Sequence, residues 1–253
     1  MTEKYEGFFL GKLNTYAHQV TGDVYVIDEY TLLIKNFHYD GLAQDAFFWA
    51  GATVRPSNIG FIVPDERGRS NKLRRYINQD ITLKVAEDKK INSLKWFSVW
   101  DIRDNRNFAD IYIPEGFEAP SPKRIAEFAQ TSHGVKSGAV TVLTSKTIKI
   151  SDFSFDGSSG THVHFYVGTG PHPNPSGKRI PNEAGYLEAL GRYESETILL
   201  TLPGEMTVFE MDWLAVWDDE HQESYGHVNI PEGLNIPPSL AIVKVSSFLR
   251  LRG

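Results

Sequence analysis

The chain repeats itself over most of its length. The phrase WFSVWD at 96–101 returns as WLAVWD at 213–218, and IPEG at 113–116 returns at 230–233. Both returns fit one shift of 117 residues, the difference between positions 213 and 96. The shift also superposes Phe48 on Phe165, Gly51 on Gly168, Glu66 on Glu183, Arg75 on Arg192 and Tyr76 on Tyr193. A repeat of about a hundred residues is typical of a duplicated domain and too long for a solenoid unit.

The register of the repeat predicts the domain boundaries. We expect a first domain over 7–119 and a homologous second domain over 131–236. Residues 120–130 form the linker, in which Ser121 and Pro122 predict the start of a short helix. Residues 237–253 remain as a C-terminal extension.

Each copy has the alternation of β-strands. In the stretch SGAVTVLTSKTIKISDF, Ile148 and Ile150 alternate with Thr147, Lys149 and Ser151. Other short apolar runs are separated by clusters of Gly, Pro, Asn and Asp, and helical periodicity is nearly absent. The sequence therefore predicts an all-β protein: two homologous antiparallel β-sandwich or barrel domains in tandem, joined by a short linker helix.

Composition excludes several classes of function. Thirty-two acids against 26 bases give a net charge of −6, so we expect neither nucleic acid nor an anionic membrane surface as a partner. The absence of cysteine excludes disulfides and thiolate chemistry. No apolar run is long enough for a transmembrane segment, and the first residues lack the pattern of a signal peptide. No cofactor is expected.

The repeated phrase places two indoles on one face of a strand, because residues two apart point the same way. A small residue, Ser98 or Ala215, stands between the indoles in each copy. Core packing is the plainer interpretation of this pattern, and a ligand platform is the alternative. The indoles concerned are Trp96, Trp100, Trp213 and Trp217.

Four aspartates are candidate ligand-binding residues. Asp101 and Asp218 close the repeated phrase, where a turn-capping role is the simpler interpretation. Asp40 and Asp156 each precede a glycine, and Asp-Gly is first of all a turn signal. A carboxylate at such a turn can also bind a ligand or calcium.

The stretch AFFWAG offers a further candidate. We expect Phe48 and its counterpart Phe165 in the core, because both positions keep an aromatic ring. Trp49 and its counterpart Tyr166 keep a flat ring with a polar edge, which suits stacking on a pyranose.

Three histidines of the second copy are candidate metal ligands. His162 and His164 share a face of a strand, and His172 follows ten residues after His162. Copper or zinc accepts such a pair when a third ligand converges. The first copy has Asp45 and Phe47 at the corresponding positions, so ordinary surface or hydrogen-bonded histidines are the simpler interpretation.

The motifs NFHYDG, AFFWAG, LRRYINQDITL, LKWFSVWD and IYIPEG, with their second-copy equivalents, follow one another in a specific order. In this order they resemble the tandem DM-thirteen domains of the Skeletor/Knickkopf family of animals, and most of all its Knickkopf branch. The resemblance covers about four fifths of the chain.

The resemblance implies an extracellular protein of arthropod cuticle. In that family the domain pair precedes a DOMON domain, a fold used for haem or sugar binding, and the whole organises chitin and shields it from chitinases. The expected function is therefore a non-enzymatic module that binds chitin or a related polysaccharide. Its expected partners are that polymer and a DOMON domain of the same full-length protein.

One departure from the family concerns redox chemistry. Many DM-thirteen domains place a cysteine after the second aromatic residue of the phrase, and this cysteine underlies a proposed electron-transfer role. Asp101 and Asp218 stand there in this chain, and a carboxylate cannot act as a thiolate. A redox module serving a haem-type domain is thus a weakened alternative, and a purely structural spacer is a third.

Overall fold

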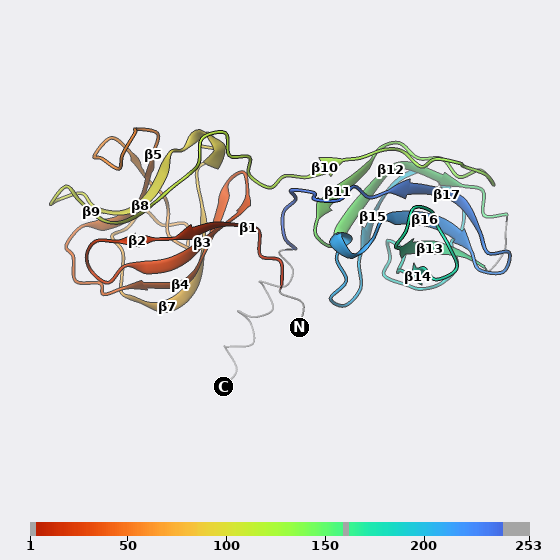
Figure 1. Ribbon diagram of the computed structural model, residues 1–253, viewed down its shortest axis with the longest axis horizontal. Coiled ribbons are helices and arrows are strands. Elements are labelled where there is room, and N and C mark those ends of the chain that lie inside the picture. The colour runs from red at the N-terminus through yellow and green to blue at the C-terminus, as the bar shows by residue number, and fades with distance from the viewer. Residues whose placement is uncertain (1–3, 159–161, 240–253) are drawn as a thin grey trace. The chain divides into compact units, whose positions relative to one another are not determined.

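The computed structural model describes residues 4–158 and 162–239. The chain divides into two compact units, Met1–Ser121 and Pro122–Gly253. Figure 1 colours the first unit from red to yellow-green and the second from green to blue. Within the described ranges, no helix is long and apolar enough to cross a membrane.

The first unit is a sandwich of two antiparallel sheets. One sheet has the order β1 (Phe8–Lys12), β3 (Thr21–Asp28), β4 (Thr31–Tyr39), β7 (Tyr76–Lys84). The other has the order β2 (Asn14–Thr15), β9 (Arg106–Tyr112), β8 (Trp96–Asp101), β5 (Ala46–Gly51), β6 (Phe61–Ile62). A single 3-10 turn, η1 (Ile91–Ser93), precedes β8.

The second unit repeats this plan. Its first sheet has the order β10 (Lys123–Arg124), β11 (Val140–Thr144), β12 (Thr147–Phe155), β15 (Tyr193–Thr201). Its second sheet has the order β14 (Lys178–Arg179), β13 (Val163–Gly168), β16 (Trp213–Asp218), β17 (Glu223–Asn229), and η2 (Val208–Glu210) precedes β16. The tandem all-β architecture expected from the repeat is confirmed.

Alternate residues of both sheets fill the core of each unit. Phe48 on β5 is fully buried and lies 5.3 Å, ring to ring, from Phe37 of the opposite sheet. Phe165 and Phe153 repeat this contact at 5.5 Å. The expected core positions of Phe48 and Phe165 are confirmed, and these rings hold the two sheets together.

The expected linker helix is wrong. Residues 122–130 contain no helix, and β10 pairs with β11 through Lys123 opposite Val142. This path of the chain also lets Phe128 bury its ring in the core of the second unit. Ser-Pro is a local helix signal, and it loses here to an open sheet edge that satisfies the backbone and to the burial of an apolar side chain.

Two glycines set the place of the repeated tryptophans. A Cβ atom on Gly51 would lie 2.3 Å from Cζ2 of Trp96, and one on Gly168 would lie 2.3 Å from Cζ2 of Trp213. Each indole therefore lies directly on the backbone of the neighbouring strand. This close approach explains why glycine and tryptophan recur together 117 residues apart, the difference between 168 and 51.

Candidate functional site

In each unit the second sheet has a face that does not line the main core, and this face carries the tryptophans. Trp49, Trp96 and Trp100 form a separate cluster there in the first unit. We call it the tryptophan face. In the first unit it comprises Phe47, Trp49, Trp96, Ser98, Trp100, Asn107, Asp110 and Tyr112; in the second it comprises His164, Tyr166, Trp213, Ala215, Trp217, Ser224, His227 and Asn229.

The strand register aligns one residue from each strand into a row across the middle of this face. From β6 to β2 the row of the first unit reads Ile62, Trp49, Ser98, Asp110, Asn14. It therefore changes from apolar at one edge of the sheet to polar at the other. The polar edge is the part of this face that can offer hydrogen bonds.

The tryptophans of this face are packed and closed to ligand. None of the chain's five indoles is more than 8% exposed. The indole nitrogen of Trp96 donates to the carbonyl of Thr53 at 2.9 Å, and that of Trp49 donates to the carbonyl of Ser57 at 3.0 Å. A pyranose needs an open ring face for stacking, so the buried rings of Trp49, Trp96, Trp100, Trp213 and Trp217 serve packing.

A carboxylate lies beneath the surface at the polar edge of the first unit. Asp110 is 2% exposed. Its Oδ1 accepts hydrogen bonds from Nδ2 of Asn14 at 3.0 Å and from the hydroxyl of Tyr16 at 3.2 Å. Its Oδ2 accepts from Nδ2 of Asn107 at 2.8 Å, and Asn107 in turn accepts from Ser98 at 2.8 Å. The donors in this network are all neutral.

Two exposed tyrosines flank Asp110. Tyr16 is 59% and Tyr112 is 45% exposed. Tyr112 lies on the same face as Asp110, because it follows two residues later on β9. Partial desolvation and the charge and hydrogen bond of Asp110 raise the pKa of Tyr16, and Tyr112 adds to the effect. We call Asn14, Tyr16, Asn107, Asp110 and Tyr112 the tyrosine site.

None of the residues of the tyrosine site was predicted from the sequence. The available signal is an alternation of polar and aromatic residues in two short stretches, Asn14 with Tyr16 and Asp110 with Tyr112. Asp110 and Tyr112 share a face of β9, but β2 ends at Thr15, one residue before Tyr16, so the first stretch is too short to show a strand periodicity.

The second unit has different chemistry at the same row, which reads Arg179, Tyr166, Ala215, His227. Tyr166, the stacking candidate, is half-buried and donates its hydroxyl to Asp219, which also pairs with Arg179. His164 is buried with Nδ1 3.0 Å from Oδ2 of Asp219, outside the direction of a hydrogen bond. Burial and the charge of Arg179 lower the pKa of His164.

The aspartates that close the repeated phrase anchor turns. Asp101 and Asp218 are both buried. Oδ1 of Asp101 accepts from the backbone N–H of Asp104 at 2.8 Å, and Oδ1 of Asp218 accepts from that of Glu220 at 2.8 Å. These contacts match the turn-capping interpretation of both residues.

The two Asp-Gly turns are also held from within. Asp40 accepts from the backbone N–H of Leu42 at 2.9 Å and lies 3.0 Å from Nδ1 of His18. Asp156 accepts from the backbone N–H and the hydroxyl of Ser158 at 2.8 and 2.6 Å. Gly157 follows with φ of 70°, in the region that favours glycine.

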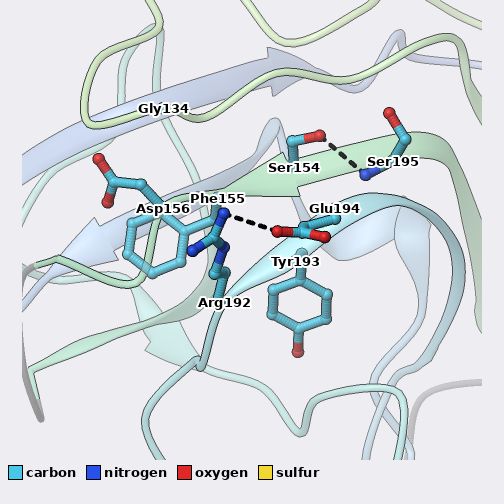
Figure 2. Close-up of a pocket in the computed structure, with 8 residues that line it drawn as sticks. All are labelled: Gly134, Ser154, Phe155, Asp156, Arg192, Tyr193, Glu194 and Ser195. Carbon is cyan, nitrogen blue, oxygen red and sulfur yellow. Dashed lines mark hydrogen bonds and ion pairs between the residues drawn. The ribbon is translucent and has the colours of Figure 1, made fainter.

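Asp156 also borders an open, shallow pocket of about 450 Å³. Figure 2 shows Arg192 extended toward Glu194, and their side chains form an ion pair at 2.6 Å while both remain largely exposed. The backbone N–H of Ser195 is bonded to Ser154 at 2.9 Å. Arg192 and Glu194 are paired with each other, and Asp156 is bonded to Ser158, so the charged groups of this pocket already have partners and favour no particular ligand.

The histidine candidates point to separate partners. Nε2 of His162 lies 3.2 Å from Glu220, and His164 faces Asp219. His172 is exposed, and its carbonyl accepts from Asn174. In the part of the chain that the structure describes, no group of three or more His, Cys, Asp or Glu side chains is arranged to hold a metal ion.

Fold and sequence together define a class of duplicated β-sandwich module built around a repeated tryptophan strand. The model of the family described as "Electron transfer DM13" matches residues 12–113 and 127–230. The chain therefore belongs to the DM13 family, and the family expected from the motifs is confirmed.

Two curated relatives extend this result. Protein Skeletor, isoforms B/C, of Drosophila melanogaster is 42% identical over 244 residues, which are 96% of this chain and 31% of that protein. Isoforms D/E match with the same identity over the same share of this chain and 16% of their own length. The chain thus spans less than a third of these relatives. Both are Skeletor proteins, so the nearer likeness to the Knickkopf branch stays a prediction. No solved structure matches the chain.

Proposed function

We propose that this chain is a non-enzymatic extracellular module that binds chitin or a related polysaccharide in the cuticle matrix and shields it from chitinases. The cuticle and chitin rest on the family resemblance. The relatives are much longer than the chain, which is consistent with further domains, and we include a DOMON domain of the same full-length protein among the proposed partners.

The tyrosine site carries this proposal. Tyr16 and Tyr112 offer open aromatic rings, and Asn14, Asn107 and Asp110 add amide and carboxylate groups beside them. Aromatic rings that stack on the apolar face of a sugar, with a few fixed polar groups that meet its hydroxyls, are the chemistry a neutral polysaccharide needs. The proposed site has therefore moved from the tryptophans to the tyrosines of the same face.

Co-sedimentation with insoluble chitin tests the proposal. We expect the full chain to sediment with chitin, and the double variant Tyr16→Ala with Tyr112→Ala to remain in solution. Tyr186→Ala is the matched control, because Tyr186 is equally exposed, at 60%, but lies in the second unit. The proposal fails if the parent chain stays in solution, or if the double variant sediments like the parent.

Electron transfer remains the second candidate, because the matching family is described by that activity. The chain offers no cysteine for it. Absorbance spectra recorded with added metals and haem would reveal a tightly bound redox centre, and such a centre would favour this candidate over matrix binding. A structural spacer is the third candidate, and binding of chitin through the tyrosines would rule against it.

A further inference from the structure

We infer that the tyrosine site prefers a saccharide polymer that carries free amino groups over its fully acetylated form. The inference rests on the proposed function and specifies the class of ligand for that site. The ligand class is a β-linked amino sugar in which part of the amines is protonated.

The carboxylate of Asp110 has no basic side chain paired with it among the described residues. Within the described residues no Lys, Arg or His forms an ion pair with Asp110, although its carboxylate is 2% exposed. Burial of a charged group is costly unless it is paired. The three neutral donors from Asn14, Tyr16 and Asn107 reduce this cost but leave the charge in place. A cation at the surface above Asp110 would supply the missing partner.

The direction of the hydrogen bond from Tyr16 also favours a ligand that donates hydrogen bonds. Its hydroxyl donates to Asp110, so the lone pairs of the phenol oxygen remain available on a side chain that is 59% exposed. A hydroxyl held in this way accepts hydrogen bonds from a ligand and does not donate to it. An ammonium group has three donors and no acceptor, whereas an acetamide brings one donor and a carbonyl acceptor.

Two exposed tyrosines near Asp110 also favour a cation. Tyr16 and Tyr112 are exposed aromatic residues near the carboxylate of Asp110, and a cation over a phenol ring is attracted by the ring itself. The effect is stronger when the cation is partly desolvated. Aromatic rings and a carboxylate together favour an organic cation over a neutral group of the same size.

The second unit does not repeat the arrangement. His227 occupies the place of Asp110, and Asn229 occupies that of Tyr112. The row there ends in Arg179, which already pairs with Asp219. The preference for amino groups is therefore a property of the first unit alone.

Calorimetric titration with soluble oligomers tests the inference. The full chain is titrated with glucosamine and N-acetylglucosamine oligomers of equal length, in a mildly acidic buffer that protonates the free amines. We expect the glucosamine oligomer to bind about tenfold more tightly, and this margin to shrink as salt screens the attraction. Asp110→Asn should bring both affinities to the same level. Asp88→Asn is the control, because Asp88 is an exposed acid whose ion pair is with its neighbour Lys89.

Three outcomes decide against the inference in different ways. If the acetylated oligomer binds equally or more tightly, the preference is wrong while the proposed function stands. If neither oligomer binds, the proposed function fails and the inference fails with it. Should Asp110→Asn be unfolded by circular dichroism, Tyr16→Phe decides, because the ring stays while the phenol oxygen and its hydrogen bond to Asp110 are lost. A several-fold weaker binding of the glucosamine oligomer alone supports the inference, and unchanged binding overturns it.

Discussion

Tyr225 donates its hydroxyl to the buried carboxylate of Asp218 across 2.5 Å. The corresponding residues of the first unit are Phe108 and Asp101, and Phe108 has no hydroxyl to donate. The two aspartates that close the repeated phrase thus have the same place and different support. Oδ2 of Asp218 also forms a hydrogen bond with Nδ1 of His221 at 3.0 Å.

Replacing this carboxylate should destabilise the second unit and reduce its sensitivity to acid. Burial opposes ionisation of Asp218, but the hydrogen bonds from Tyr225 and His221 prevail and hold its pKa well below the usual range. A lowered pKa in the folded state gives stability that is present above about pH 4 and lost as the pH falls further. Asp218→Asn should cost about 2 kcal/mol at neutral pH and flatten this acid loss, as measured by urea unfolding.

Asp101→Asn provides the comparison for Asp218→Asn, since the donors to Asp101 in the described residues are the backbone N–H groups of Asp45 and Asp104. A smaller loss is expected for it. Equal losses in the two variants would show that the Tyr225 bond contributes nothing beyond the turn.

Gly168→Ala should destabilise the second unit by about 1 to 3 kcal/mol. The added methyl group would meet the indole of Trp213, which is fully buried and cannot move aside without disturbing the sheet. Thermal unfolding measures the loss. Gly191→Ala is the control, because no atom lies within 4 Å of a Cβ at that position. A stability of Gly168→Ala equal to that of Gly191→Ala would mean that the indole is free to shift.

His164→Phe should make the second unit more resistant to mild acid. His164 is buried, and its lowered pKa means that the folded state favours the neutral ring. Stability is therefore lost as the pH falls below about 6.5, where the unfolded chain takes up the proton. Phenylalanine occupies the equivalent position 47 in the first unit, so the shape is compatible with this sheet.

Unfolding of His164→Phe and the parent should be compared at pH 7 and near pH 5. Part of the acid loss will remain, since burial also lowers the pKa of His227. His162→Gln serves as control, because it removes a nearby histidine whose side chain is 47% exposed and not buried. An unaltered profile for His164→Phe would contradict the prediction.

Iodide should quench the tryptophan fluorescence of the folded chain only weakly. All five indoles are at most 8% exposed, and a charged quencher needs direct contact with the ring. Quenching should rise to that of a free indole in guanidinium chloride, and chitin oligomers should leave the folded value unchanged. Strong quenching that chitin relieves would return the binding site to the tryptophans.

More of the fold than of the candidate site could be predicted from the sequence. The duplicated phrase and the alternation around Ile148 are local patterns, and they are enough to predict two β-sandwiches and the buried places of Phe48 and Phe165. The predicted linker helix was wrong because the local helix signal at Ser121 and Pro122 was weaker than the pairing of Lys123 with a strand that follows later in the chain.

The tyrosine site escaped prediction for a related reason. Tyr16 and Asp110 are 94 residues apart, and the contact between them depends on a two-residue strand at the sheet edge. The tryptophans attracted attention because they are large and repeated, yet repetition of a bulky residue marks a conserved need for packing as readily as a shared ligand. The pairing of the strands and the exposure of each side chain are needed to tell which aromatic residues remain open to solvent.

The row across the tryptophan face has a consequence for how a duplicated chain can change. Phe48 and Phe165 keep the same place in the two cores, whereas the row bears a buried acid at position 110 and a buried histidine at position 227. Two copies of one scaffold thereby carry different polar side chains at the same position of the sheet. Loss of either copy would therefore remove side chains that the other copy does not supply at the same place in the sheet.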